Sequence, residues 1–184
     1  MIPMIETKRL KLRGHEARDF PDSAAMWADP EVVRYIGTPS NRQQAWSRFL
    51  VYLGHWSAMG FGYWAVEEKI TGRFIGEIGF SDFKRELMPP LEGIPEVGWV
   101  LVPDAQGKGY ATEGVLAALE WSASHFGSRK ISCLIDAKNA PSVRVAERCG
   151  FQQSHSARYL EKNTEVYFKD LLGKSHDHSE SHDE

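Results

Sequence analysis

Residues 100–113 read VLVPDAQGKGYATE and combine the end of an apolar strand, a glycine-rich loop and the first turn of a helix. Gly107 and Gly109 permit positive φ angles and carry no Cβ that would hold a ligand away from the backbone. The free N–H groups and the positive dipole end of the following helix point back at this loop. Lys108 adds a positive charge there. The stretch therefore predicts a site for an anionic group of pyrophosphate type.

Two common phosphate-binding motifs do not fit this loop. In a P-loop the last glycine is followed by Lys and then Ser or Thr, whereas Gly109 is followed by Tyr110. The fingerprint G-x-G-x-x-G requires a third glycine where this chain has Thr112. The loop also follows four predicted strands, whereas a dinucleotide-binding unit usually opens its domain. A nucleotide-binding protein is therefore the weakest of the functional hypotheses.

Length and composition are those of an ordinary globular domain. The chain has 184 residues, of which 42% are hydrophobic and 26% are charged, and its net charge is -3. This charge argues against a general nucleic-acid surface, and no apolar run approaches the length of a membrane span. The start of the chain lacks the layout of a signal peptide. Cys133 and Cys149 show no CxxC spacing, so we expect two free thiols in a cytoplasmic protein.

Hydrophobic periodicity predicts a mixed α/β domain with a strand–loop–helix–strand crossover in its middle. We expect residues 1–173 to form this domain and the polar residues 174–184 to be a disordered tail. His176, His178 and His182 in that tail could bind a metal, but a solvated tail is favoured and no metal is expected. The predicted elements are a strand at 5–13, helices at 15–28 and 41–59, a hairpin at 60–68 and 73–83, a strand at 96–102, a helix at 110–126, a strand at 130–136, a short helix at 141–149, and closing strands at 151–160 and 164–172.

Four segments together resemble one enzyme family. Residues 106–111 (QGKGYA) resemble the Q/R-x-x-G-x-G/A loop of the GNAT N-acetyltransferases. Residues 139–142 (NAPS) and 147–151 (ERCGF) are similar to the N-x-x-S…EK-x-GF block of its RimJ/RimL-like branch, the ribosomal-protein N-terminal acetyltransferases. Residues 6–13 and 29–35 also resemble that branch. The resemblance covers nearly the whole chain except the tail, and it is the ordered set of motifs that makes it specific.

The resemblance implies the GNAT fold, an α/β (α+β) three-layer arrangement with a twisted, mixed, mostly antiparallel sheet. That sheet is splayed where acetyl-CoA, the cosubstrate, binds. By this analogy one group of residues holds the CoA pyrophosphate: Gln106, Gly107, Lys108, Gly109, Tyr110, Ala111 and Thr112. The backbone of Val100, Leu101 and Val102 pairs with the pantetheine arm, and an amide there could polarise the thioester carbonyl. Asn139 and Ser142 lie at the pantetheine arm, and Arg148 or Lys108 approaches the nucleotide phosphates or remains a solvated surface group.

Acetyl transfer to an amine needs an unprotonated nitrogen, and an α-amine (pKa ~8) loses its proton more easily than a lysine amine (pKa ~10.4). A pocket carboxylate can act as base, directly or through water. Glu96 is the first candidate, because it begins the strand that runs along the cofactor. A solvent-facing glutamate at a strand end is an equally weighted interpretation. Glu77 and Glu161 are weaker candidates for the base.

The proton donor for the leaving thiolate is less well marked. Many family members use a tyrosine on the short helix before the Gly-Phe pair, and here Ala146 holds that position. In the RimJ/RimL-like branch the serine of N-x-x-S takes this role, which indicates Ser142; a hydroxyl that only hydrogen-bonds backbone or cofactor is an equal alternative. Tyr159 is the reserve donor. The acidic residue of the branch near the closing hairpin aligns with Glu161 or with Arg158, and an arginine could not act as base.

The leading hypothesis is an acetyl-CoA-dependent N-acetyltransferase in which the amine attacks directly within a ternary complex. No Ser/His/Asp set indicates a covalent intermediate. The acceptor is a protein N-terminus or a small amine. The alternative is a non-catalytic acyl-CoA-binding sensor or interaction module, which would bind the cofactor without turnover. We expect no nucleic-acid or membrane partner. A homodimer formed through a C-terminal strand is compatible with the sequence, which does not require it.

Overall fold

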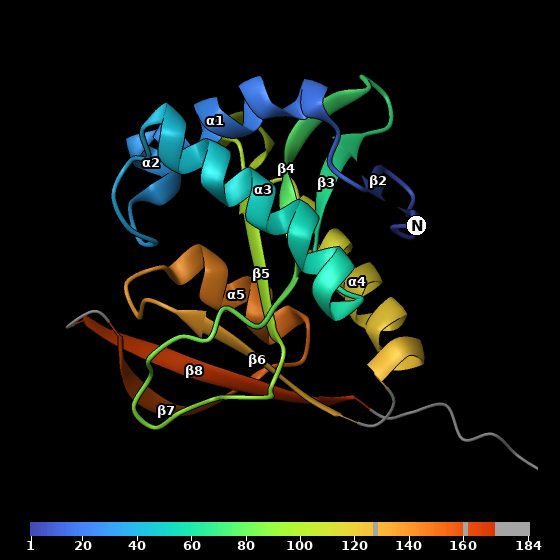
Figure 1. Ribbon diagram of the computed structural model, residues 1–184. Coiled ribbons are helices and arrows are strands. Elements are labelled where there is room, and N and C mark those ends of the chain that lie inside the picture. Colours follow the sequence, from blue (N-terminus) through green and yellow to red (C-terminus); the bar gives the residue numbers. More distant parts are fainter. Residues whose placement is uncertain (127–128, 160–161, 172–184) are drawn as a thin grey trace, which may run out of the picture.

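The computed structural model describes residues 1–126, 129–159 and 162–171, and a mixed sheet of eight strands runs through it (Figure 1). The strand order is β1-β2-β3-β4-β5-β6-β8-β7. All neighbours pair antiparallel except β5 and β6, which run parallel. The mixed, mostly antiparallel sheet predicted from the sequence is confirmed. The strands are β1 (Ile5–Glu6), β2 (Leu10–Arg13), β3 (Tyr63–Glu68), β4 (Arg73–Ser81), β5 (Glu96–Leu101), β6 (Arg129–Ile135), β7 (Gln152–Tyr159) and β8 (Lys162–Leu171).

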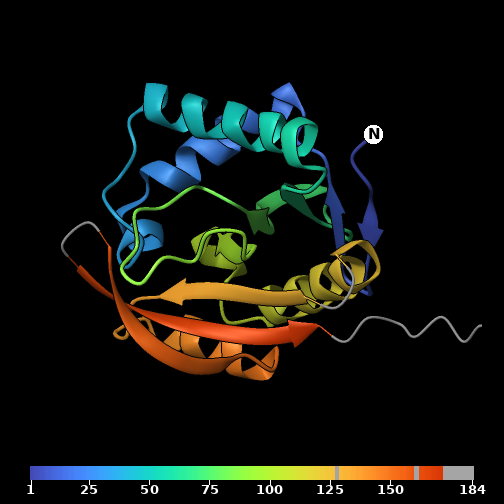
Figure 2. The same cartoon turned by 60° about the horizontal axis from the view of Figure 1, so that its bottom comes forward.

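Strands β5 and β6 pair at one point only. Glu96 and Ser132 are the paired residues, and the Ser132 amide donates to the Pro95 carbonyl at 2.9 Å. Beyond this point the two strands diverge, and Figure 2 shows β6 continuing beside β8, away from β5. The sheet is therefore splayed along residues 97–101 of β5, whose edge lacks a β6 partner there.

The two faces of the sheet carry different helices (Figure 1). One face carries α1 (Phe20–Ala28), α2 (Pro30–Val33) and α3 (Arg42–Met59), and the other carries α4 (Tyr110–Phe126) with α5 (Ala140–Arg148). Phe74 and Val100 pack against α1 and α2, while Ile78 and Phe80 belong to the core beneath α4. Phe74 and Ile78 lie an even number of residues apart, and the extra residue of β4 between Phe74 and Gly76 places them on opposite faces. Helices α4 and α5 flank β6, as a parallel crossover requires.

The helical spacing of five apolar residues predicts the buried stripe of α3, namely Trp46, Phe49, Leu50, Leu53 and Trp56. The residues that α3 buries differ in part from this stripe. Asn41 and Gln44 form a reciprocal capping box at its start, and Gly60, with φ 74°, ends it. Its buried residues are Ala45, Phe49, Tyr52 and Trp56. Trp46 and Leu50, expected in the core, are 42% and 46% exposed. Ala45 is small and adds little to the hydrophobic pattern. The predicted buried face is therefore rotated about the helix axis relative to the observed one.

The loop between β4 and β5 crosses to the far end of the sheet. Met88 forms a bridge with Arg158 of β7, and the buried side chain of Leu87 packs with Ala157 and Val166 of the C-terminal hairpin. These contacts span the splay. The loop therefore joins the two parts of the sheet on the face that carries α1 and α3.

Candidate active site

The glycine loop presents a row of free backbone N–H groups. Gly107 and Gly109 have φ angles of 72° and 80°, so the positive φ predicted for both is present. Within the described residues, none of the amides of residues 107–112 has a hydrogen-bond acceptor. Helix α4 begins at Tyr110, so its dipole adds positive potential at the same place. This arrangement suits a multiply charged anion.

An ion pair from the opening strands supports this loop. The Glu113 carboxylate accepts hydrogen bonds from the Thr7 hydroxyl at 2.6 Å, from the Arg9 amide at 2.9 Å and from Arg9 Nε at 2.6 Å. Arg9 Nη1 also donates to the Lys108 carbonyl at 2.8 Å. Partial burial acts to raise the pKa of Glu113, but the bonds from Thr7 and Arg9 lower it overall. The loop carbonyl is thus turned toward Arg9 and away from the amide row.

Two further side chains predicted for the anion site serve as structural contacts. Gln106 Nε2 donates to the Leu101 carbonyl at 3.0 Å, which fixes the loop to the end of β5. The Tyr110 hydroxyl donates to Glu68 at 2.5 Å, and this bond raises the pKa of Tyr110. Lys108 is exposed, while Ala111 and Thr112 are half-buried in the first turn of α4. The backbone of this segment, more than its side chains, therefore forms the site.

The edge of β5 continues from the loop toward Glu96. The Val102 amide donates to the Ile75 carbonyl, so it is used within the sheet. Since antiparallel residues alternate in the direction of their backbone groups, the N–H groups of Val97, Trp99 and Leu101 point away from β4. That of Val97 is used in the parallel pairing with Ser132, and those of Trp99 and Leu101 point into the splay. Of the three predicted residues Val100, Leu101 and Val102, only Leu101 directs its N–H there. Gln106 already occupies the Leu101 carbonyl.

Glu96 lies at the point where β5 and β6 part and is paired with Arg85. Arg85 Nε and Nη2 donate to the two carboxylate oxygens at 2.8 and 3.1 Å, and Arg85 Nη1 donates to the Tyr159 hydroxyl at 3.1 Å. Burial acts to lower the pKa of Arg85, but the attraction of Glu96 raises it well above its usual range. An ionised carboxylate has about four lone-pair sites, of which Arg85 uses two. Glu96 therefore keeps acceptor sites for a substrate.

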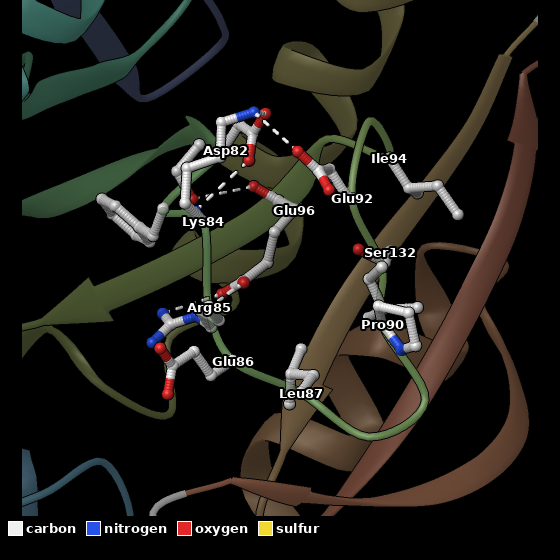
Figure 3. Close-up of a pocket in the computed structure, with 13 residues that line it drawn as sticks. Asp82, Lys84, Arg85, Glu86, Leu87, Pro90, Glu92, Ile94, Glu96 and Ser132 are labelled. Carbon is white, nitrogen blue, oxygen red and sulfur yellow. Dashed lines mark hydrogen bonds and ion pairs between the residues drawn. The ribbon is translucent and has the colours of Figure 1, made fainter.

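Glu96 and Arg85 line a cavity of about 290 Å³ on the α1–α3 side of the splay (Figure 3). Its other walls come from β4, from the β4–β5 loop and from Ser132 of β6. Ser132 is fully buried and its hydroxyl donates to the Pro95 carbonyl at 3.3 Å. Among the charged lining residues, Lys84 pairs with Asp82 at 2.6 Å. The cavity thus combines acidic and basic groups with apolar walls.

Glu77 is fully buried and serves the fold. Its carboxylate accepts hydrogen bonds from Ser23 at 2.7 Å and from Trp27 at 2.8 Å, and it lies 3.3 Å from His15 Nε2. These partners connect β4 to α1 and to the segment before it. Glu77 does not line the cavity that Glu96 lines, so of the two carboxylates only Glu96 is placed at the splay.

Asn139 and Ser142 lie at the start of α5, beyond the far end of β6. The Asn139 side chain caps this helix by accepting from the Ser142 amide at 3.2 Å. Ser142 is half-buried, and within the described residues its hydroxyl has no hydrogen-bond partner. Ala146 is fully buried. The predicted base Glu96 thus lies on β5, whereas the predicted acid Ser142 lies on α5, the helix that follows β6.

Several sequence predictions fall outside the site or outside the described residues. Glu161 and the histidines of the tail lie outside the described residues. Cys133 and Cys149 are free and buried, and burial raises the pKa of the Cys149 thiol to about 11. No group of three or more His, Cys, Asp or Glu residues in the described ranges could hold a metal ion. Those ranges also contain no helix long and apolar enough to cross a membrane.

Sequence reasoning missed two residues of the site region. Arg85 was only one of several charges in the loop 84–95, and nothing in the sequence pairs it with Glu96. Arg9 was part of a matched segment, but its contact with Glu113 joins residues 104 positions apart. Long-range ion pairs of this kind leave no periodic signal. Only the fold brings their members together.

Comparison with known proteins agrees with this geometry. Residues 9–152 match the acetyltransferase (GNAT) domain family. The chain is 30% identical over 164 residues to YkkB, an uncharacterised protein of Bacillus subtilis (strain 168), covering 88% of this chain and 92% of that protein. It is 26% identical to YoaA, an uncharacterised N-acetyltransferase of the same organism, over 91% and 93% of the two chains.

Among solved structures, an acetyltransferase of Agrobacterium tumefaciens str. C58 superposes with a TM-score of 0.80 at 29% identity. The alignment covers 92% of this chain and 95% of the other. The matched domain spans both the glycine loop and the splayed strands. The chain therefore belongs to the GNAT acetyltransferase family, and it is an acyltransferase.

Proposed function

We propose that this enzyme transfers the acetyl group of acetyl-CoA to a primary amine by direct attack in a ternary complex. The observation that carries the proposal is the alignment of two features along β5. A strand edge without a β6 partner runs from Val97 to Leu101, and the row of free amides at residues 107–112 follows it. An extended ligand that ends in a pyrophosphate suits both features at once.

The chain's own residues would hold this cosubstrate in two ways. The amides of the loop and of the first turn of α4 would bind the pyrophosphate oxygens, with Lys108 as an additional mobile charge. The N–H groups of β5 that point into the splay would pair with the amides of the pantetheine arm. Asn139 and Ser142, at the start of α5, would approach this arm from the other side. Each of these contacts is a hydrogen bond that the protein offers without rearrangement.

The reaction then needs one base and one acid. The amine nitrogen forms a bond to the acetyl carbonyl carbon, the carbon–sulfur bond breaks, and sulfur leaves with the electron pair. The amine proton passes to Glu96, directly or through water, because Glu96 lies at the vertex of the splay. Ser142, Tyr159 or water returns a proton to the thiolate. The products are the N-acetylated amine and free CoA.

The cavity beside Glu96 would receive the acceptor amine. Its 290 Å³ lie at the lower end of the range for small-molecule pockets. This volume suits a small amine or the terminal residue of a peptide. A RimL ribosomal L7/L12 alpha-N-protein acetyltransferase and a spermidine N-acetyltransferase share the fold at 14% and 18% identity. Proteins of this fold thus act on different acceptors, so the fold itself does not indicate the acceptor. Support for a protein N-terminus comes only from the RimJ/RimL-like sequence motifs.

The test is free-thiol release from acetyl-CoA with a panel of N-terminal peptides, amino acids and polyamines. We expect release that depends on one class of amine, and its loss in Gly109→Trp, because residue 109 has a positive φ and lies in the amide row. The matched control is Gly37→Trp, since a Cβ there meets nothing within 4 Å. Binding of acetyl-CoA without release to any amine would favour the non-catalytic module. Failure to bind CoA at all would contradict the proposal.

A further inference from the structure

A tyrosine side chain lies across the sheet over two glycines. Tyr63 of β3 pairs with Gly79 of β4, and Gly79 pairs with Gly98 of β5. A Cβ built on Gly98 would lie 2.0 Å from the Tyr63 hydroxyl oxygen, a distance that atoms cannot adopt. The hydroxyl therefore occupies the place that a side chain of residue 98 would take. Glycine is required at 98 because Tyr63 ends there.

This position is on the strand that borders the splay. Gly98 follows Glu96 by two residues, so the Tyr63 hydroxyl and the Glu96 side chain share one face of β5. The N–H group of the neighbouring Trp99 points into the splay, as the bond between Val102 and Ile75 shows. A hydroxyl donor and a backbone donor thus border the same short stretch of β5. In the proposed complex, the thioester would lie beside this stretch of β5.

The Tyr63 hydroxyl is buried beside Ser81. Tyr63 is 6% exposed, and Ser81 is a hydrogen-bond neighbour of its hydroxyl. Burial raises the pKa of Tyr63 well above its usual value, and the nearby charge of Glu96 raises it further. A phenol that holds its proton so firmly is a poor acid for a thiolate, because efficient proton transfer needs matched pKa values. It remains a hydrogen-bond donor over the whole working pH range.

We propose that the Tyr63 hydroxyl donates a hydrogen bond to the acetyl carbonyl oxygen as negative charge develops there. The inference rests on the proposed acetyl transfer. The hydroxyl would act together with the backbone N–H of Trp99, which makes a pair of donors for the oxyanion. Arg85, paired with Glu96, offsets the negative charge of that carboxylate beside the oxygen. Tyr63 keeps its proton, so no proton transfer is assigned to it.

The decisive variant is Tyr63→Phe, which removes only the hydroxyl. The ring would keep its stack on Tyr52, whose centroid lies 4.5 Å away, so the melting temperature should stay within about 1 °C. Loss of one oxyanion donor lowers kcat by about 10²–10³ in a known case, and we expect a fall of at least about tenfold here, since the backbone donor remains. The KM for acetyl-CoA should not change. The control is Tyr52→Phe, which removes a buried hydroxyl that does not lie over β5 and should leave kcat within about twofold.

A second variant tests the geometry without touching Tyr63. Gly98→Ala would displace the hydroxyl, so it should lower both kcat and the melting temperature. In the Tyr63→Phe background the nearest ring atom to that Cβ is Cζ at 3.2 Å, a contact that a small shift relieves. The same substitution should therefore cost much less stability there. Such non-additivity would identify the contact between the two positions.

The outcomes separate this inference from the proposed function. A wild-type enzyme with no amine-dependent thiol release would overturn both. An active wild type with an unchanged kcat in Tyr63→Phe would overturn the inference alone. If Tyr63→Phe abolished an alkaline limb of the pH–rate profile, Tyr63 would be an acid and the assigned role would be wrong. A lower rate with an unchanged profile would support it.

Discussion

Glu96 shows how one residue combines a structural bond with a chemical role. It begins β5, it is the residue of that strand that pairs with β6, and Arg85 holds its carboxylate in a two-point ion pair. The pair fixes the direction of the carboxylate at the vertex of the splay. Arginine cannot take the proton of the amine, so Glu96 is the proposed base of this pair.

For Glu96→Gln we expect kcat to fall about 100-fold, which is within the range for loss of a general base. The affinity for CoA, measured by calorimetry, should stay within about twofold, because the amide row of residues 107–112 is distant in the chain and unchanged. Arg85→Gln is the matched control, since it breaks the same ion pair and leaves the carboxylate. Equal losses of kcat in both variants would mean that the ion pair matters and the base is elsewhere.

At the scale of elements, the glycine loop depends on strands far away in the sequence. Thr7 and Arg9, which lie between β1 and β2, hold Glu113 in the first turn of α4, and Arg9 also binds the Lys108 carbonyl. Glycine gives the loop its freedom, and this contact restricts it to one conformation. The proposed anion site therefore depends on the connection between β1 and β2 as well as on α4.

We expect Glu113→Gln to destabilise the fold by about 1 kcal/mol at pH 7, since Arg9 is half-exposed and its ion pair is partly screened. The pKa of Glu113 is lowered in the fold, so its contribution is complete above the unfolded value of 4.5 and is lost as the pH falls through the lower folded value. Denaturant unfolding from pH 7 to pH 3 should show the difference from wild type shrinking below pH 4.5. Glu120→Gln, an exposed position on α4, should change little at any pH. A constant difference would contradict the assignment.

The sequence predicted the positions of helices and strands better than it predicted which of their faces are buried. The glycine loop, the hairpin at Lys69–Gly72 and helix α4 were predicted with nearly the observed bounds, because glycine turns and helix ends depend on local chemistry. The buried faces of helices were not. The helical spacing of Leu116, Leu119, Ala123 and Phe126 predicts one buried face of α4, but Leu116 is 45% exposed. Gly114 and Ala118 are buried beneath the sheet instead. Small residues at a close helix–sheet contact carry little hydrophobic signal.

Only part of the candidate site was predicted from the sequence, and the reason is similar. Its backbone component follows from glycine spacing and strand order. Arg85 and Tyr63 act through contacts with residues far along the chain, and the sequence does not mark either of them. The glycine at position 98 was visible in the sequence, but the reason for it, the hydroxyl of Tyr63, becomes clear only in the folded sheet.

At the scale of the whole molecule, the β4–β5 loop links the two parts of the sheet. Leu87 is 4% exposed and packs with Ala157 and Val166, while the neighbouring Met88 bonds β7 through its backbone. Arg85 leaves the same loop to reach Glu96 and Tyr159. One loop thus sets the wall of the cavity and joins it to the C-terminal hairpin.

We expect Leu87→Ala to raise the KM for the acceptor amine several-fold and to leave the KM for acetyl-CoA unchanged, because the loop lines the cavity and does not touch the amide row. Truncation of a buried leucine also costs about 2–5 kcal/mol of stability, so steady-state kinetics should be measured well below the melting temperature. Met88→Ala removes a side chain that is 72% exposed and is the control. A rise in both KM values would show that the loop supports the whole fold and not the acceptor cavity.

The single pairing of Glu96 with Ser132 has a consequence for the energetics of the enzyme. The β1–β5 and β6–β8 portions of the sheet are joined at one paired position. Along the rest of their common boundary the backbone groups have no strand opposite them. In the proposed complex the cosubstrate fills that boundary and becomes a structural member of the sheet. Binding of the cosubstrate would then also stabilise the fold, so depletion of acetyl-CoA in a cell would make this enzyme easier to unfold.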